Sequence, residues 1–262
     1  MEKILNMLKD ILYNLIWTLR KIPRKTYNKN AFKNTQGLRN PYRYYLFDEL
    51  KNIFKNNHFA NSRILEIGPK DGEDSLRLAS LNPSELILID LPENKDPNHH
   101  NFKFHEEYFM PNYKKINGKK NIIYENFNYL KNDELDNLGK FDLIWFTGVL
   151  YHTQEQLRML RKIYNLLNPN GVLVLETSTT RNNSLKKHSV IEITVEGEYH
   201  FPSKKAVTTM LGMIGFSDLI VSKCYDRENY NKNNIRFALF AQKKEKVSQI
   251  LYRGKYLYGD AT

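Results

Sequence analysis

The chain has 262 residues, of which 41% are apolar, enough for one α/β domain of ordinary size with extensions. A single cysteine, Cys224, excludes an internal disulfide and a cysteine-cluster metal site. The net charge of +11 is concentrated near the N-terminus, because residues 1–60 hold 12 Lys or Arg and four Asp or Glu residues. This cluster favours an anionic surface, nucleic acid or anionic substrate as partner, with a solvated basic face as the plain alternative.

The first 20 residues predict an amphipathic helix, because their apolar side chains recur at helical spacing. The stretch is too polar and short for a membrane span. Trp17 and the basic run at 20–25 are typical of an interfacial helix, so residues 1–25 are expected to touch anionic lipid or, alternatively, to pack on protein. No secretory signal is recognisable, which predicts a cytoplasmic protein with peripheral membrane contact at most.

After a linker-like stretch, helical spacing resumes over residues 41–55. A short apolar strand, Arg63–Ile67, follows and ends in the glycine loop Gly68-Pro69-Lys70-Asp71-Gly72. Residues 73–79 predict a helix that opens with acidic residues. This arrangement of strand, glycine loop and helix brings a ligand against backbone N–H groups at a helix N-terminus.

The spacing of the loop differs from the G-x-G-x-x-G of dinucleotide folds. Glu66, Gly68 and Gly72 instead resemble the E/D-x-G-x-x-x-G loop of class I S-adenosylmethionine-dependent methyltransferases. The resemblance implies S-adenosylmethionine as cofactor, with these three residues around its methionine end and with Lys70 and Asp71 among its contacts.

The next predicted strand, residues 85–90, ends in Asp90, which lies 22 positions after Gly68. An acid at this offset can accept hydrogen bonds from both ribose hydroxyls of an adenosine ligand, or it can simply cap the following segment. Residues 91–120 predict a loop or helix beside the substrate pocket. Their histidines and glutamates show no metal-ligand spacing, so no metal is expected.

A third strand is predicted over residues 121–124. The resemblance implies that Asn126 bonds the adenine amino group and that Phe127 packs on the ring. Residues 141–146 predict a fourth strand, followed by the run TGVLYH at 147–152.

A helix over 154–167, a turn at 168–171 and a fifth strand at 172–177 complete this region. The whole stretch is similar to class I methyltransferases, and most similar to the tRNA wobble-uridine carboxymethyltransferase branch and related small-molecule methyltransferases. The resemblance adds Thr147 and Gly148 to the expected cofactor contacts.

His152 is the candidate catalytic base, because a hydroxyl or amine acceptor must lose a proton and histidine accepts one near neutral pH. The alternative is a histidine that bonds backbone at a helix start or lines the pocket. Tyr151, and His188 and His200 in and after an insertion at 178–199, are the further candidates for the substrate pocket.

The remaining pattern predicts a helix from the FPS turn to Gly215 and two closing strands at 216–225 and 236–242. The expected fold is Rossmann-like α/β: a seven-stranded, mostly parallel sheet with a terminal antiparallel hairpin, helices on both faces and an N-terminal helical arm. Residues 1–58 are assigned to that arm, 59–243 to the methyltransferase domain, and 244–262 to an appendage.

The favoured function is methyl transfer to a hydroxyl of a small molecule, sugar or glycan. The basic arm and the TGVLYH run keep a tRNA-modifying transferase as one alternative. A non-catalytic methyltransferase-like binding subunit is the other. The acceptor atom and the oligomeric state are not determined by the sequence.

Overall fold

The computed structural model describes residues 41–55, 57–92, 95–97, 99–119, 121–129, 133–194, 197–223 and 236–244, with two short strands near the C-terminus. The expected amphipathic helix over residues 1–20 and Cys224 lie outside these residues. From Tyr42 onward the chain forms one compact unit. No helix in the described ranges is long and apolar enough to cross a membrane.

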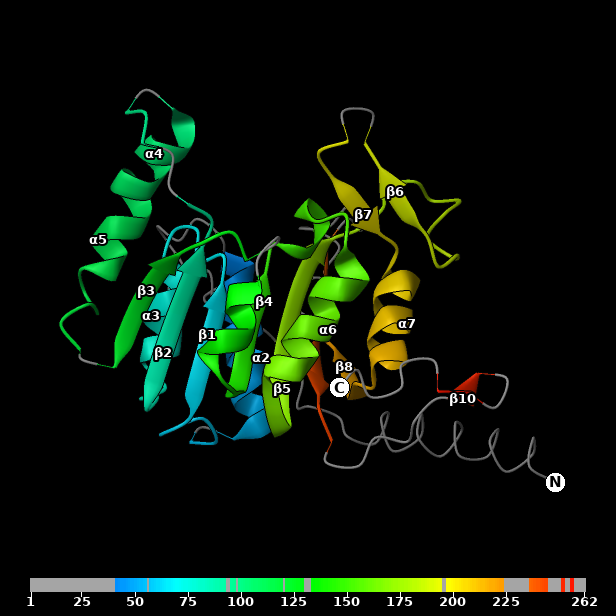
Figure 1. Ribbon diagram of the computed structural model, residues 1–262, viewed down its shortest axis with the longest axis horizontal. Coiled ribbons are helices and arrows are strands. Elements are labelled where there is room, and N and C mark those ends of the chain that lie inside the picture. Colours follow the sequence, from blue (N-terminus) through cyan, green and yellow to red (C-terminus); the bar gives the residue numbers. More distant parts are fainter. Residues whose placement is uncertain are drawn as a thin grey trace, which may run out of the picture. The chain divides into compact units, whose positions relative to one another are not determined.

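The centre of the unit is a seven-stranded sheet in the order β3-β2-β1-β4-β5-β9-β8 (Figure 1). The first five strands of this order are parallel, whereas β9 is antiparallel to β5 and to β8. The strands are β1 (Arg63–Ile67), β2 (Glu85–Asp90), β3 (Ile122–Asn126), β4 (Phe141–Thr147), β5 (Leu167–Ser178), β8 (Ser217–Val221) and β9 (Arg236–Gln242). The predicted sheet with its terminal antiparallel hairpin is confirmed.

Two small antiparallel sheets accompany the main one. The first joins β6 (Ile191–Ile193) to β7 (His200–Pro202), and the second joins β10 (Leu251–Tyr252) to β11 (Lys255–Tyr256). Figure 1 shows that β6 and β7 stand beyond the edge at which the parallel strands end. β6 lies in the insertion that the sequence places after the fifth strand, and β7 directly follows that insertion.

Helices cover both faces of the sheet: α6 lies on one face, and α2 and α3 lie on the other (Figure 1). The helical segments are α2 (Pro41–Phe54), α3 (Glu73–Ala79), α4 (His100–Phe104), η2 (His105–Phe109), α5 (Met110–Tyr113), η3 (Asp133–Leu138), η4 (Leu150–His152), α6 (Gln156–Leu166) and α7 (Lys204–Ile214). Ser203 is the N-cap of α7, and Gly215, with φ 115°, is its C-cap, as the sequence predicts.

The core lies between α6 and the sheet. The buried face of α6 carries Met159, Leu160, Ile163 and Leu166 at helical spacing. Each such side chain stabilises the fold by about 1.5–3 kcal/mol on burial. Because β1 and β4 are buried on both faces, their sequences are almost continuously apolar.

Two predicted boundaries are wrong for physical reasons. The turn expected at 168–171 is a bulge inside β5, because Leu167 already pairs with Phe141 before the register shifts. The third strand extends to Asn126, because Asn126 pairs with Asp90 of the neighbouring strand. Residues 100–113, left open between loop and helix, are helical from α4 to α5.

Candidate functional site

The glycine loop follows β1 at the point where the strand order reverses, which is where open α/β sheets bind ligands. Gly68 and Gly72 have φ of 74° and 73°, in the left-handed region that favours glycine. A Cβ on Gly68 would lie 2.6 Å from Cγ2 of Val149. The loop backbone therefore approaches the segment after β4 closely, and only glycine permits this.

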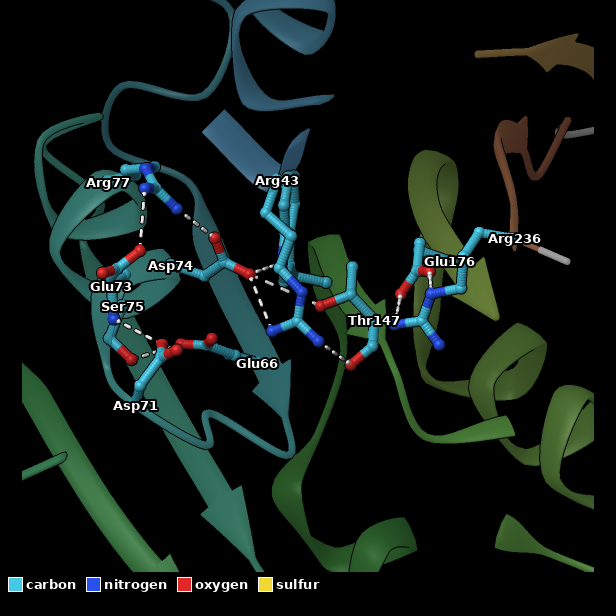
Figure 2. Close-up of polar contacts among 11 residues, drawn as sticks. Arg43, Glu66, Asp71, Glu73, Asp74, Ser75, Arg77, Thr147, Glu176 and Arg236 are labelled. Carbon is cyan, nitrogen blue, oxygen red and sulfur yellow. Dashed lines mark hydrogen bonds and ion pairs between the residues drawn. The ribbon is translucent and has the colours of Figure 1, made fainter. Parts of the chain in front are cut away.

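Three carboxylates surround the loop and the start of α3: Glu66, Asp71 and Asp74, all of them buried (Figure 2). Oδ1 of Asp71 accepts from the backbone N–H of Glu73 at 3.1 Å, and Ser75 donates to Glu66 at 2.6 Å. Burial raises the pKa of Glu66 well above its ordinary value, and repulsion from Asp74 and Asp71 adds to that increase. These three residues form a buried carboxyl cluster in which Glu66 keeps its proton to higher pH and Asp71 bonds the first turn of α3.

Asp74 is the centre of a buried polar network that sequence reasoning missed (Figure 2). Its carboxylate accepts from Arg43 at 3.3 Å, from Trp145 Nε1 at 3.0 Å and from Arg77 at 2.5 Å. Arg43 also donates to the carbonyl of Thr147 at 3.4 Å. The network therefore ties α2 to the first turn of α3 and to the end of β4.

The second predicted ligand region lies at the ends of β2 and β3. Asp90 is half-buried at the end of β2, and the N–H of Phe127 donates to its carbonyl at 3.1 Å. Asn126 is exposed beside it, whereas Phe127 packs against the hydrophobic core. Burial and the charge of Asp90 together raise the pKa of Tyr129, the next ring along the chain.

The residues at these strand ends fit the adenosine part of the expected cofactor. Oδ1 of Asn128 is buried without a hydrogen-bond partner, which marks a place for a donor such as an adenine amino group. The carboxylate of Asp90 supplies acceptors for ribose hydroxyls. The side-chain amide oxygen without a hydrogen-bond partner is that of Asn128, whereas the resemblance implied Asn126.

Thr147 and Gly148 lie directly after β4. Thr147 is buried, and its hydroxyl lies 3.5 Å from the carboxylate of Asp74. Gly148 has φ 76°, and a Cβ there would lie 2.5 Å from a guanidinium nitrogen of Arg43. Both residues therefore pack against the buried network of Arg43 and Asp74.

The 3₁₀ turn η4 places Tyr151 and His152 in a cluster of rings. Tyr151 lies 5.9 Å from Tyr199 and 5.9 Å from Phe201, measured between ring centroids, and His152 lies 5.3 Å from Tyr199. Tyr151, Tyr199 and Phe201 are half-buried, and His152 is exposed. We call these four residues the aromatic cluster.

Neighbouring protein atoms lower the pKa of His152 by removing water from its ring, and the positive charges of Lys70 and Arg236 lower it further. The imidazole is therefore neutral near pH 7 and able to accept a proton. Arg236 forms a buried ion pair with Glu176 at 2.7 Å, and its guanidinium lies 5.6 Å from the ring centre of Tyr151.

The remaining predicted residues lie apart from the cluster or play other roles. Lys70 is exposed, with its ammonium 5.8 Å from the ring centre of Phe104, and it reaches the cluster only through the effect of its charge on His152. His188 is exposed, and its backbone bonds Leu185 and Ser203. His200 is buried, with an unbonded Nδ1, and the alternation of strand β7 places it on the opposite face from Tyr199 and Phe201.

The described ranges contain no group of three or more His, Cys, Asp and Glu side chains arranged to hold a metal ion. The network residues Arg43 and Asp74, the rings Tyr199 and Phe201, and Arg236 were not predicted from the sequence. Of these residues, only Asp74 had a feature in the sequence that could have identified it: it lies in the acidic first turn of α3.

Comparisons with known proteins show the family and the fold. The family model described as a methyltransferase domain matches residues 38–219. The tRNA U34 carboxymethyltransferase of Campylobacter lari is 31% identical over 115 residues, which cover 44% of this chain and 34% of that protein. The enzyme of Aliivibrio fischeri is 33% identical over 95 residues, covering 35% and 29%. The chain thus spans about a third of the length of these curated relatives.

Two solved structures share the fold. The N-methyltransferase NodS of Bradyrhizobium japonicum, in complex with S-adenosylhomocysteine, has a TM-score of 0.53 at 17% identity, covering 79% of this chain and 90% of that chain. The 1,6-didemethyltoxoflavin N1-methyltransferase of Burkholderia thailandensis has a TM-score of 0.51 at 14% identity, covering 92% and 90%. The chain therefore belongs to the methyltransferase domain family, the class I S-adenosylmethionine-dependent methyltransferases, as its glycine loop and TGVLYH run predict.

Proposed function

We propose that this methyltransferase transfers a methyl group to a hydroxyl oxygen of a small molecule or sugar. The observation that carries the proposal is the placement of His152. It is an exposed, neutral imidazole in η4, the turn that follows β4, beside half-buried rings that offer an acceptor surface. A hydroxyl acceptor needs such a base, since its proton must leave as the new bond forms.

S-adenosylmethionine is the methyl donor of this family. Asp90 and Asn128 would hold its ribose and adenine, and the loop from Gly68 to Gly72 would hold its methionine end. When bound, it supplies a methyl carbon whose bond to sulfur breaks, with the electron pair kept by sulfur, as the acceptor oxygen forms its bond to carbon. A ring nitrogen of His152 accepts the hydroxyl proton, and the backbone fixed by Gly148 sets the ring's place beside the loop.

Positioning of the acceptor supplies much of the catalysis in a displacement of this kind. The close packing of the glycine loop on Val149 keeps the loop and η4 at a fixed separation.

A second function, tRNA modification, is supported by the curated relatives, which are tRNA U34 carboxymethyltransferases. Their similarity covers only about a third of their length. We therefore keep the small acceptor as the proposed function and treat tRNA as its competitor.

The test is calorimetric titration of S-adenosylmethionine into the full chain and into Asp90→Ala. We expect the substitution to weaken binding by about tenfold to a hundredfold, because hydrogen bonds to a charged group are worth about 1.5–3 kcal/mol. Asp136→Ala, which removes an exposed carboxylate from η3, is the matched control and should bind as the unaltered chain does. A folded chain that binds no S-adenosylmethionine would remove the enzymatic function.

A further inference from the structure

We propose that the acceptor is a small molecule with a flat aromatic or heteroaromatic ring that bears an acidic hydroxyl, and that Tyr151, Tyr199 and Phe201 hold this ring beside His152. The proposal rests on the function proposed above and narrows its acceptor from hydroxyl compounds in general to one chemical class. Three independent features of the aromatic cluster lead to it.

The first feature is the orientation of the rings. The planes of Tyr199 and Phe201 are 11° apart with centroids 5.8 Å apart, and those of Tyr151 and Phe201 are 26° apart. Near-parallel rings with part of their surface open to solvent can extend their array by one more flat ring. Tyr199 directly precedes β7 and Phe201 lies within it, so the two residues are two positions apart. Their near-parallel rings can therefore face the same ligand.

The second feature is the charge around the cluster. Arg236 lies over Tyr151, and the guanidinium of Arg181 lies 5.8 Å from the ring centre of Phe201. Two carboxylates contact these residues or their neighbours: Glu176 pairs with Arg236, and Glu192 accepts from Thr180 and from the backbone of Arg181. The charge that His152 experiences from Lys70 and Arg236 is positive. A developing oxyanion is stabilised in such surroundings.

The third feature is the weak basicity of His152, whose pKa lies below the ordinary value. A phenolic hydroxyl ionises near a pKa of about 10, whereas an aliphatic hydroxyl has a much higher pKa. At a given pH the ionised fraction of the phenol is therefore far larger. A weak base flanked by cations suits the acidic hydroxyl and serves a sugar alcohol poorly.

In the resulting arrangement the ring of the acceptor lies against Tyr199 and Phe201. Its hydroxyl oxygen becomes the methylated atom, and the proton of that hydroxyl passes to a ring nitrogen of His152. Lys70 and Arg236 stabilise the oxyanion before the bond to carbon forms. No oxidant or further reactant is needed.

The experiment uses the full chain saturated with S-adenosylhomocysteine and two probes. One is 4-nitrophenol, whose ionised form absorbs visible light, and the other is methyl β-D-glucopyranoside. Saturation-transfer NMR measures the binding of each probe, and absorbance measures the ionised fraction of bound 4-nitrophenol. Neither readout depends on methyl transfer.

We expect 4-nitrophenol to bind, to become more ionised when bound, and to resist displacement by the glucoside. Tyr199→Leu and Phe201→Leu should weaken its binding by about tenfold, because each removes one stacking ring. Tyr199→Phe keeps the ring and should bind normally. Lys70→Met should keep binding but reduce the ionised fraction.

The matched control is Tyr164→Leu. Tyr164 is a half-buried ring near the other end of α6 with the ammonium of Lys243 at 4.7 Å, so its removal should leave the probe unaffected. Equal binding of glucoside and 4-nitrophenol, or unchanged binding in both Tyr199→Leu and Phe201→Leu, would overturn the proposal. Calorimetry with S-adenosylhomocysteine distinguishes a failure of the acceptor class from a failure of the proposed function. If S-adenosylhomocysteine binds and 4-nitrophenol does not, only the acceptor class is wrong.

Discussion

At the scale of single residues, the site depends on charges that are buried together. Arg43 and Asp74 have side-chain exposures of 6% and 1%, so neither charge is solvated when the other is removed. If Arg43 is removed, Asp74 keeps its ion pair with Arg77, at 2.5 Å. The two partners are therefore not equivalent, and substitution should reveal the difference.

We predict that Asp74→Asn lowers the free energy of unfolding by about 3–5 kcal/mol, because it leaves the guanidinium of Arg43 buried without its counter-charge. Arg43→Met should cost less, since Arg77 continues to pair with Asp74. Urea unfolding measures both. Arg158→Met, which breaks the exposed pair with Glu155, is the control and should change the free energy by about 1 kcal/mol or less. Equal costs for Asp74→Asn and Arg158→Met would contradict the assigned burial.

The raised pKa of Glu66 predicts how stability depends on pH. Above the ordinary carboxyl pKa the unfolded chain loses the proton of Glu66 while the folded chain keeps it, so the folded state binds more protons. Stability from this group is therefore complete at low pH and falls as pH rises from the ordinary value through the raised one. Glu66→Gln should flatten this slope, which unfolding measurements across that pH range would detect. The same slope in both proteins would show that Glu66 titrates normally.

At the scale of elements, the glycine loop joins β1 to α3 by a conformation that other residues adopt only with strain. Gly68 combines a positive φ with a close approach to Val149, so an added side chain meets both a backbone cost and a steric one. The loop is consequently the part of the site least tolerant of substitution.

We predict that Gly68→Ala destabilises the fold by about 1–3 kcal/mol from backbone strain alone and weakens S-adenosylmethionine binding. Adding Val149→Ala should recover part of the loss, because it removes the methyl group at 2.6 Å but leaves φ at 74°. Gly118→Ala is the control, since no atom lies within 4 Å of its added Cβ. Thermal unfolding and calorimetry check these variants, and a harmless Gly68→Ala would refute the steric assignment.

At the scale of the whole molecule, the net charge of +11 raises the question of a nucleic-acid partner. If tRNA is the acceptor, its affinity must fall steeply with salt, because binding releases counterions from the phosphates. If the acceptor is a small molecule, as proposed, tRNA should show no such steep dependence of its affinity on salt. We expect full-chain titrations with bulk tRNA to give weak binding without base-modified product at any salt concentration. Salt-dependent, saturable binding with modification of a tRNA base would replace the proposed function by its competitor.

The sequence by itself determined the fold and the cofactor loop. Apolar runs of strand length, the spacing of Glu66, Gly68 and Gly72, and the acid at position 90 are local signals, because each depends on residues within one βα unit. The residues at which β3 ends and β5 begins were less predictable, because they depend on pairing with Asp90 and Phe141 of neighbouring strands. His152 could be named as a candidate because it follows a recognisable strand.

Only the tertiary structure decided what surrounds these residues. Arg43 and Asp74 are 31 positions apart and meet because α2 packs against the helix that follows the loop. Tyr151 meets Tyr199 and Phe201 only because the insertion returns over the end of β4. Burial and charge at such meetings depend on residues distant in the chain, so the raised pKa of Glu66, the weak basicity of His152 and the aromatic cluster exist only in the folded protein.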